Sequence, residues 1–230
     1  MKLISVVGIR KSGKTTTVTQ LTEALIRRGL KVATAKTVFC PTFSIDKPTS
    51  NTGRHAAAGA EVVVARAKGE TAVIYKRRLP LTQVLQPLQG CDVVILEGDY
   101  NAPVPRLVAA HQQEDALLRC NDLTLCFVGR IADKPEIDLP LPRFNPLTEA
   151  DALADFVLAH VDDVQLTDAL DIPLPPVAGV TDDGFCQCGC HKNERKCADE
   201  QTSVTVDGVK LQLTAEQLAT LRQWAAEAKA

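Results

Sequence analysis

The fold of this 230-residue chain is decided by the stretch Gly8-Ile9-Arg10-Lys11-Ser12-Gly13-Lys14-Thr15. This stretch satisfies the pattern G-x-x-x-x-G-K-[ST], which describes a phosphate-binding loop when a strand precedes it and a helix follows it. Both flanks fit the pattern. The apolar, β-branched residues 3–8 predict a strand, and the spacing of Val18, Leu21 and Leu25 predicts a helix. A chance glycine-rich turn would not be expected to have both flanks.

The residue types of this loop indicate its ligand. Gly8 and Gly13 let the backbone curl so that successive N–H groups point at phosphate oxygens, and the start of the following helix adds positive potential. We expect Lys14 to bridge the terminal phosphates and to act in any catalysis, and the Thr15 hydroxyl to bind Mg²⁺. The other residues expected on the nucleotide are Lys11, Ser12 and Thr16. The sequence therefore predicts a nucleotide site with bound magnesium.

The surrounding pattern predicts an α/β fold. The helix after the loop ends at Gly29, and residues 32–37 predict a second strand, so the first 37 residues form a βαβ unit with parallel strands. Further strands are expected at residues 62–65, 72–75, 91–99, 106–109 and 123–128. Helices are expected at residues 54–60, 81–88 and 149–160. The sequence thus predicts a P-loop NTPase fold, with a mostly parallel sheet flanked by helices.

Length and composition predict that the chain has more than one structural region. At about 150 residues per domain, the chain holds one full domain and an appendage. We expect a nucleotide-binding domain over residues 1–160, a linker rich in Asp, Pro and Thr over residues 161–184, and a small cysteine-rich α+β module over residues 185–230. In that module Asp207-Gly208 suits the turn of a β-hairpin, and residues 215–229 predict a helix.

Carboxylates provide the second half of the predicted site. Glu97 closes the apolar run at residues 93–96, where P-loop proteins place an acid that binds Mg²⁺ or polarises the attacking water. Asp99 follows two residues later and is a weaker candidate. Asp46, in an irregular loop, is either an acid of the nucleotide site or an ordinary solvent-facing residue. The chain has no Asn-Lys-x-Asp guanine signature, because Ala132-Asp133-Lys134 is only a fragment of one, so the local motifs leave the choice between GTP and ATP open.

Charge and hydropathy exclude two classes of partner. Residues 1–160 carry 20 Lys and Arg against 16 Asp and Glu, whereas residues 161–230 carry 6 against 12. A net charge of +4 over the larger part suits phosphate ligands but lacks the dense basic face of a nucleic-acid-binding protein. No apolar run approaches the roughly 18 residues that span a bilayer, and no export signal opens the chain. We therefore expect a cytoplasmic protein with neither nucleic-acid nor membrane partners.

Four of the eight cysteines gather near the carboxyl end, at Cys186, Cys188, Cys190 and Cys197. In a reducing cytosol a disulfide framework is not expected, so these thiolates predict a metal site. Soft sulfur ligands suit zinc or an iron–sulfur cluster. The C-x-C-x-C spacing is tighter than that of structural zinc pairs, and a reactive redox cluster or unliganded cysteines are the alternatives.

Several stretches resemble the molybdopterin-guanine dinucleotide biosynthesis protein B (MobB) family. They are GIRKSGKTT (8–16), LIRRGLKVATAK (25–36), IDKP (45–48), GRHAAAGAEVVV (53–64), DVVILEGDYNAPVPRLV (92–108) and LPRFNPLTEADALADFVL (141–158). The most diagnostic are the EG-x-x-x-x-P-x-P-[KR] run and the Asp-Lys-Pro that precedes AGA. The resemblance implies a P-loop protein that binds GTP with Mg²⁺, hydrolyses it slowly if at all, forms a homodimer, and assists the molybdenum cofactor assembly enzyme that attaches GMP to molybdopterin.

The chain departs from the family at two positions of the predicted site. Family members usually carry histidines after the lysine that ends the second strand, whereas Thr37, Val38, Phe39 and Cys40 follow Lys36 here. A small or polar residue is usual at position 11, where this chain has Lys11.

Two other classes of protein compete with the function that the family resemblance implies. A small-molecule kinase would use Lys76-Arg77-Arg78 as basic lid residues, and a metallochaperone-type NTPase would couple the cysteine cluster to nucleotide state.

Overall fold

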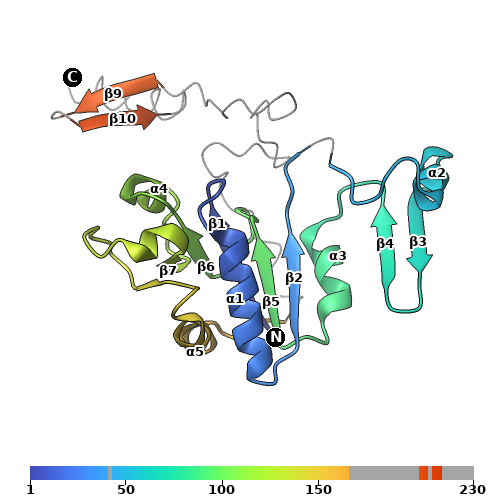
Figure 1. Ribbon diagram of the computed structural model, residues 1–230, viewed down its shortest axis with the longest axis horizontal. Coiled ribbons are helices and arrows are strands. Elements are labelled where there is room, and N and C mark those ends of the chain that lie inside the picture. The colour runs from blue at the N-terminus through green and yellow to red at the C-terminus, as the bar shows by residue number, and fades with distance from the viewer. Residues whose placement is uncertain (41–42, 166–201, 207–208, 214–230) are drawn as a thin grey trace. The chain divides into compact units, whose positions relative to one another are not determined.

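The computed structural model describes residues 1–40, 43–165, 202–206 and 209–213. The chain divides into two compact units, residues 1–38 with 44–174 and residues 39–43 with 175–230. The first unit holds a six-stranded sheet (Figure 1) in the order β2-β5-β1-β6-β7-β8. Its strands are β1 (Lys2–Gly8), β2 (Val32–Lys36), β5 (Val93–Glu97), β6 (Arg106–Ala109), β7 (Thr124–Val128) and β8 (Arg143–Phe144). All neighbouring pairs in this sheet are parallel, which confirms the predicted fold class.

The register of the sheet determines which residues meet at its carboxyl edge. Strand β1 lies between β5 and β6, with Val6 beside Glu97 and Gly8 beside Ala109. Strand β2 lies on the other side of β5, with Lys36 beside Glu97. Ligands of open parallel sheets bind outside the carboxyl ends of the strands. The end of β1, where the predicted phosphate loop begins, is therefore flanked by the ends of β5 and β6.

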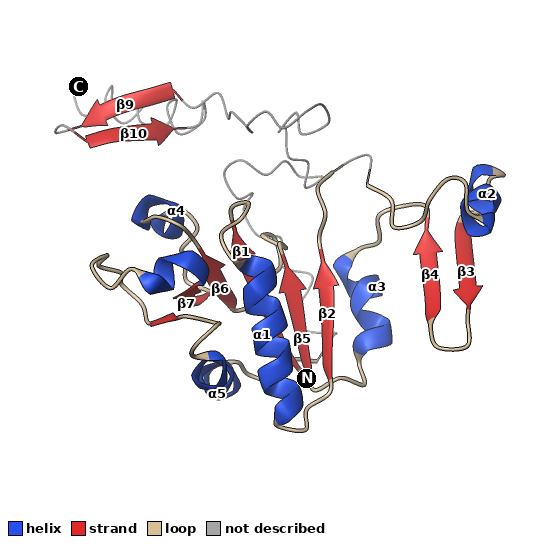
Figure 2. Cartoon of the chain, viewed as in Figure 1, coloured by secondary structure: helices blue, strands red, loops and turns tan. Residues whose placement is uncertain are grey.

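Helices cover both faces of the sheet (Figure 2), because its strands are apolar on both sides. One face packs against α1 (Lys14–Arg27) and α5 (Ala150–His160), with Leu21 and Leu25 of α1 fully buried. Burying a leucine of this kind contributes about 1.5–3 kcal/mol. The other face packs against two groups of short elements. They are α3 (Leu81–Leu85) with η1 (Gln86–Leu88), and α4 (Gln113–Leu117) with η2 (Gly129–Asp133).

The predicted strands over residues 62–65 and 72–75 do form, but outside the main sheet. Strands β3 (Val62–Arg66) and β4 (Thr71–Tyr75) make a separate antiparallel hairpin. Helix α2 (Asn51–Ala57) contacts β3, and the Ser50 hydroxyl caps this helix by accepting a hydrogen bond of 2.8 Å from the Gly53 amide. The local sequence that predicted these strands carries no information about which sheet they join.

The second unit contains one described pair of strands. Strands β9 (Thr202–Val206) and β10 (Val209–Leu213) are antiparallel, as the hairpin around Asp207-Gly208 predicted. The expected cysteine cluster, the terminal helix and most of the linker fall outside the described residues, so the proposed division at residues 160 and 184 stays a prediction. In the described part of the chain, every helix is too short or too polar to cross a lipid bilayer.

Candidate functional site

Residues 8–13 form a tight loop between β1 and α1, and two glycines explain its shape. Gly8 has a φ of 149°, and a Cβ there would lie 2.0 Å from the Ala109 carbonyl oxygen. Gly13 has a φ of 105° and precedes α1, and its Cβ would lie 2.9 Å from the Cα atom of Gly129. Only glycine fits such positions without displacing the backbone. The loop is therefore packed against the ends of β6 and β7.

Two further loop residues, Lys11 and Ser12, have features that are unfavourable for stability. Lys11 has a φ of 62°, the left-handed conformation that costs a residue with a side chain about 1–2 kcal/mol. The Ser12 hydroxyl is buried and has no hydrogen-bond partner within the described part of the chain. Strain and unsatisfied polar groups concentrate at binding sites, where a ligand supplies the missing partner. A phosphate oxygen is a suitable acceptor for this hydroxyl.

Lys14 turns its side chain back over the loop. Its Nζ donates hydrogen bonds of 2.8 and 2.6 Å to the carbonyl oxygens of Gly8 and Ile9. Burial lowers the pKa of Lys14, the carboxylate of Glu97 opposes that shift, and the positive charge of Lys36 adds to it. An anion beside the ammonium group would favour its charged form. The Lys14 ammonium group thus lies where it could bind a phosphate held by the loop.

Glu97 joins the loop to two neighbouring strands. Its side chain is only 8% exposed, and its Oε1 atom accepts hydrogen bonds from Thr15 Oγ1 at 2.7 Å and from Lys36 Nζ at 2.8 Å. A threonine hydroxyl and a carboxylate are the oxygen ligands that Mg²⁺ prefers. The residues therefore fit the expected metal ion. The sequence did not predict Lys36 as a residue of this site. Its position at the end of β2 would have indicated a contact with Glu97 only if the strand order had been known, because β2 neighbours β5.

The segment after Glu97 is held against the loop by residues for which the sequence analysis predicted no role in the site. The Tyr100 hydroxyl hydrogen-bonds with both the amide and the carbonyl group of Gly8, and its distance to the amide nitrogen is 2.9 Å. The Ser5 hydroxyl donates to the Asp99 carbonyl oxygen at 2.8 Å, and the buried Arg106 donates to that of Tyr100 at 3.2 Å. Burial lowers the pKa of Arg106, with Asp99 opposing the shift.

The carboxylate of Asp99, the weaker acidic candidate, stabilises its own turn. It accepts hydrogen bonds from the amides of Asn101 and Ala102, each at 3.2 Å. Carboxylates at the start of a turn commonly bond to the backbone two or three residues later. The turn therefore explains why an aspartate stands at position 99, and no ligand is needed to explain it.

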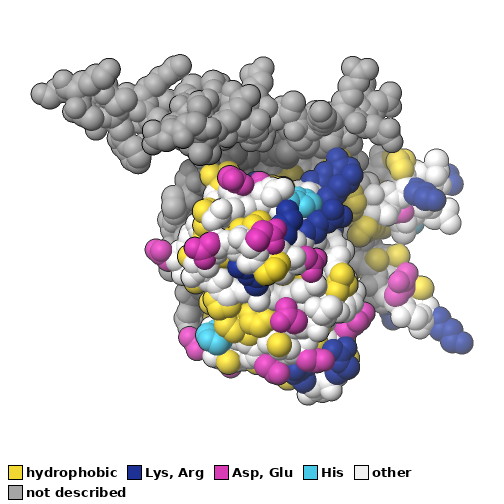
Figure 3. Space-filling model, turned by 60° about the vertical axis from the view of Figure 1, so that its left-hand side comes forward, with side chains coloured by type: hydrophobic (Ala, Val, Ile, Leu, Met, Phe, Trp, Pro, Cys, Tyr) yellow, Lys and Arg dark blue, Asp and Glu magenta, His cyan; other side chains and the backbone are white. Residues whose placement is uncertain are grey.

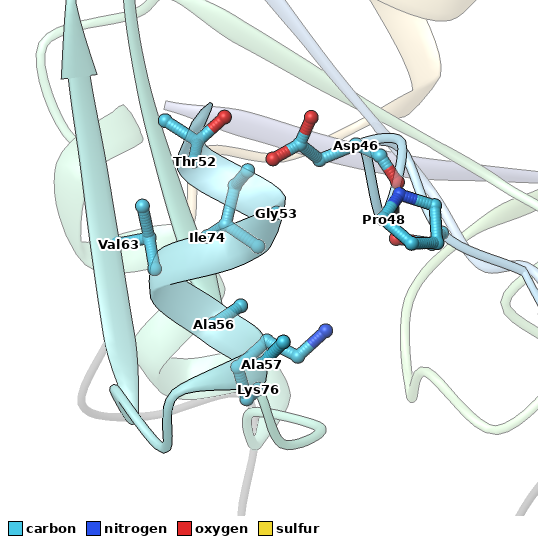
Figure 4. A pocket seen from close by; sticks show the side chains of 10 residues that line it. Asp46, Pro48, Thr52, Gly53, Ala56, Ala57, Val63, Ile74 and Lys76 are labelled. Atoms are coloured by element: carbon cyan, nitrogen blue, oxygen red, sulfur yellow. Dashed lines mark hydrogen bonds between the residues drawn. The ribbon is translucent and has the colours of Figure 1, made fainter. Parts of the chain in front are cut away.

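Asp46 lies in a different place, at a pocket beside helix α2 (Figure 4). Its Oδ1 accepts a 2.6 Å hydrogen bond from the Ser50 hydroxyl, and hydrogen bonds from Ser50 and Thr52 lower the pKa of its carboxyl group. The pocket, of about 180 Å³, is lined by Ser44, Asp46, Pro48, Thr52, Gly53, Ala56, Ala57, Val63, Ile74 and Lys76. The contacts described for Asp46 are thus with this segment, and its role on the nucleotide stays a prediction.

Basic side chains gather with a histidine on one face of the molecule (Figure 3). Near the phosphate loop, the Nε2 atom of His111 lies 3.4 Å from the Arg10 carbonyl oxygen, and Lys134 Nζ donates to the His111 carbonyl oxygen at 2.8 Å. Arg10, Lys11 and Arg130 are exposed. Positive potential of this kind attracts phosphate groups.

The predicted metal-binding cysteines, Cys186, Cys188, Cys190 and Cys197, lie outside the described residues. Among the residues that are described, no group of three or more His, Cys, Asp or Glu side chains could hold a metal ion. The zinc or iron–sulfur prediction therefore still depends on the sequence alone.

Comparisons with known proteins point to one family. The profile described as "Molybdopterin guanine dinucleotide synthesis protein B" matches residues 3–129, more than half of the chain. The crystal structure of Bacillus subtilis MobB is 25% identical, with a TM-score of 0.56, and the match covers 70% of this chain and 99% of that one. A MobB homologue from Bacillus stearothermophilus is 23% identical, with a TM-score of 0.52 and coverage of 70% and 100%. A comparison with curated proteins finds no match.

Proposed function

Since this chain belongs to the molybdopterin guanine dinucleotide synthesis protein B family, we propose that it binds GTP with Mg²⁺ at residues 8–16. The family supports a role in molybdopterin guanine dinucleotide synthesis. The finer function that we propose is that of an adapter for the molybdenum cofactor assembly enzymes. The observation that carries the proposal is the loop itself. Lys14 folds over the loop carbonyl groups, Thr15 hydrogen-bonds with Glu97, and the buried Ser12 hydroxyl has no hydrogen-bond partner among the described residues.

Each residue of the site has a separate task in this proposal. The loop amides and Lys14 hold the phosphates, and the short Thr15–Glu97 hydrogen bond brings together the two side chains that would hold Mg²⁺. The metal ion, when bound, neutralises phosphate charge. Glu97 accepts from both Thr15 and Lys36 on one oxygen, so it acts as a charge partner more readily than as a general base. This arrangement agrees with slow hydrolysis of GTP at most.

The experiment that tests the metal part of the proposal replaces Lys36 by alanine. Without Lys36, the nearly buried Glu97 carboxylate loses the cation that it pairs with. The free energy of unfolding, measured in EDTA, should therefore fall by about 1 kcal/mol, which lowers Tm by about 2–4 °C. Mg²⁺ should restore this loss by binding to Glu97 and Thr15. We therefore expect the Mg²⁺-induced rise in Tm to be larger in K36A than in the wild type.

Lys31→Ala is the matched control, because Lys31 is an exposed lysine at the other end of the same strand. Its response to Mg²⁺ should equal that of the wild type. An unchanged Tm in EDTA together with an unchanged Mg²⁺ response in K36A would count against Glu97 as the metal-binding acid.

We also propose that the chain forms a homodimer through the outer face of the β3–β4 hairpin. The register pairs Val62 with Tyr75 and Val64 with Val73, so these four side chains share one face. All four are 43–52% exposed, whereas Val63, on the face toward α2, is 5% exposed. A contiguous apolar strip of this kind is typical of an interface, and a second copy of the chain is the occupant expected from the family.

Val64→Asp should disrupt this dimer, because each subunit would bury a carboxylate without a partner. Sedimentation equilibrium should then show a monomer under conditions in which the wild type is a dimer. Leu147→Asp is the control, since Leu147 is 66% exposed and lies outside the hairpin. A dimer that persists in V64D, or a monomeric wild type, would contradict the proposal.

For the second unit we propose a metal site formed by Cys186, Cys188, Cys190 and Cys197. What supports it is the gathering of four thiols within a short stretch of sequence. Zinc and an iron–sulfur cluster are the two candidates. Elemental analysis of the full chain, purified without oxygen, distinguishes them.

A further inference from the structure

We propose that the carboxylate of Asp133 binds the guanine base of the nucleotide, and that Asn145 holds this carboxylate in place. The inference rests on the proposed nucleotide binding at residues 8–16. It deepens that proposal, because it names the group that would select GTP over ATP, a choice that the local motifs left open.

The segment that carries Asp133, η2, begins in contact with the phosphate loop. A Cβ on Gly129, the first residue of η2, would lie 2.2 Å from the Ser12 carbonyl oxygen, so the backbones are in direct contact. The Arg130 amide donates a 3.2 Å hydrogen bond to the same oxygen, and the Ile131 amide donates to the Ala110 carbonyl oxygen at 2.9 Å. The segment therefore starts against the phosphate loop, at the carboxyl edge where a bound nucleotide would lie.

Asp133 is held in place by a hydrogen bond from Asn145. The Asn145 Nδ2 donates a hydrogen bond to Asp133 Oδ1, which links the ends of β7 and β8. Asn145 is itself fixed, since its amide donates to Glu149 Oε2 at 2.8 Å and its Oδ1 accepts from the Leu147 amide at 2.8 Å. Within the described residues Asp133 is exposed and has no ion-pair partner. A carboxylate can accept about four hydrogen bonds, so acceptor capacity remains for a ligand.

The hydrogen-bonding edge of guanine matches a carboxylate. Guanine presents N1–H and its 2-amino group as two adjacent donors on one edge, which match the two oxygens of a carboxylate. Adenine has no 2-amino group, and its N1 atom is an acceptor that a carboxylate repels. A bidentate pair of this kind discriminates between bases by about 10- to 100-fold. A carboxylate with spare acceptor capacity, carried by a segment whose first residues contact the phosphate loop, is thus suited to guanine.

The sequence alone could not make this assignment, because the complete signature is absent. Asn-Lys-x-Asp ending at Asp133 would need asparagine and lysine at positions where Arg130 and Ile131 stand. Ile131 is fully buried in the core beneath the sheet edge and cannot reach a base. Of the three fixed residues of that signature, only the aspartate is present, as Asp133. Its significance becomes visible through the contacts of Gly129 and Arg130 with Ser12.

The test is Asp133→Asn in the full chain, measured by calorimetric titration with GTP, XTP and ATP in the presence of Mg²⁺. Xanthine carries a carbonyl oxygen where guanine has the 2-amino group, so the asparagine amide can donate to it. We expect the variant to lose about 10- to 100-fold in GTP affinity and to bind XTP more tightly than GTP. Wild-type protein should show the opposite order.

Asp138→Asn is the control, because Asp138 is another exposed acid on the connection between β7 and β8, and this variant should keep the wild-type preference. Equal affinities of the wild type for GTP and ATP, unchanged in D133N, would overturn the assignment of Asp133 while leaving the phosphate loop intact. Absence of binding by every triphosphate would overturn the proposed function and this inference together.

Discussion

Replacing Lys14 by alanine is expected to weaken GTP binding by at least about 100-fold, which corresponds to about 3 kcal/mol. The ammonium group would make charge-assisted hydrogen bonds to the terminal phosphates, and alanine can make none of them. In the structure its hydrogen bonds are with the carbonyl oxygens of Gly8 and Ile9. Burial lowers the pKa of Lys14, and an anion beside the ammonium group would favour its charged form. Calorimetric titration with GTP and Mg²⁺ measures the loss.

We expect K14A to fold normally. Its Tm and circular dichroism spectrum should stay close to those of the wild type, because the partly buried ammonium group that is removed has a desolvation cost of its own. Lys68→Ala is the matched control, since Lys68 is an exposed lysine in the turn between β3 and β4 and should keep full affinity. Retention of GTP affinity by folded K14A would show that residues 8–16 do not bind the phosphates.

Replacing Gly129 by alanine is expected to have the largest effect on stability. The added Cβ would lie 2.2 Å from the Ser12 carbonyl oxygen, which belongs to the backbone and cannot rotate away, and Gly129 also has a φ of 76°. Backbone strain and overpacking together should cost about 3 kcal/mol or more, which lowers Tm by about 6–12 °C for a domain of this size. Thermal unfolding followed by circular dichroism measures this change.

A second glycine tests whether the effect comes from the contact with the phosphate loop. A Cβ on Gly69, in the β3–β4 turn, would meet no atom within 4 Å, and Gly69 has no positive φ. Gly69→Ala should therefore change Tm by less than about 2 °C. A G129A protein as stable as G69A would mean that η2 does not press against Ser12, which would also remove the main support for a base site at Asp133.

Local sequence patterns predicted the elements well because each pattern reports the burial of one segment. The apolar runs at residues 3–8 and 93–96 became the central strands β1 and β5, and the spacing of Val18, Leu21 and Leu25 became the buried side of α1. The pairing of strands depends on contacts between distant residues. For that reason the sequence did not predict that β3 and β4 leave the main sheet, nor the short elements α4, η2 and β8.

The candidate site was predictable where a contiguous motif encodes it. The loop geometry agrees with the spacing of Gly8, Gly13 and Lys14, and the Thr15–Glu97 hydrogen bond agrees with the expected position of the acid. Lys36 and Tyr100 were missed because their contacts depend on the order of the strands and on the turn after β5. Neither residue belongs to a motif with chemistry of its own, so no local pattern could have indicated them.

The most direct test of the account is a crystal structure of the full chain grown with Mg²⁺ and a non-hydrolysable GTP analogue. We predict that the β and γ phosphates accept hydrogen bonds from the backbone amides of residues 11–15 and that Lys14 leaves the Gly8 and Ile9 carbonyl oxygens to contact them. The guanine edge should face Asp133. An analogue bound elsewhere, with Lys14 still folded onto the loop, would contradict the central claim.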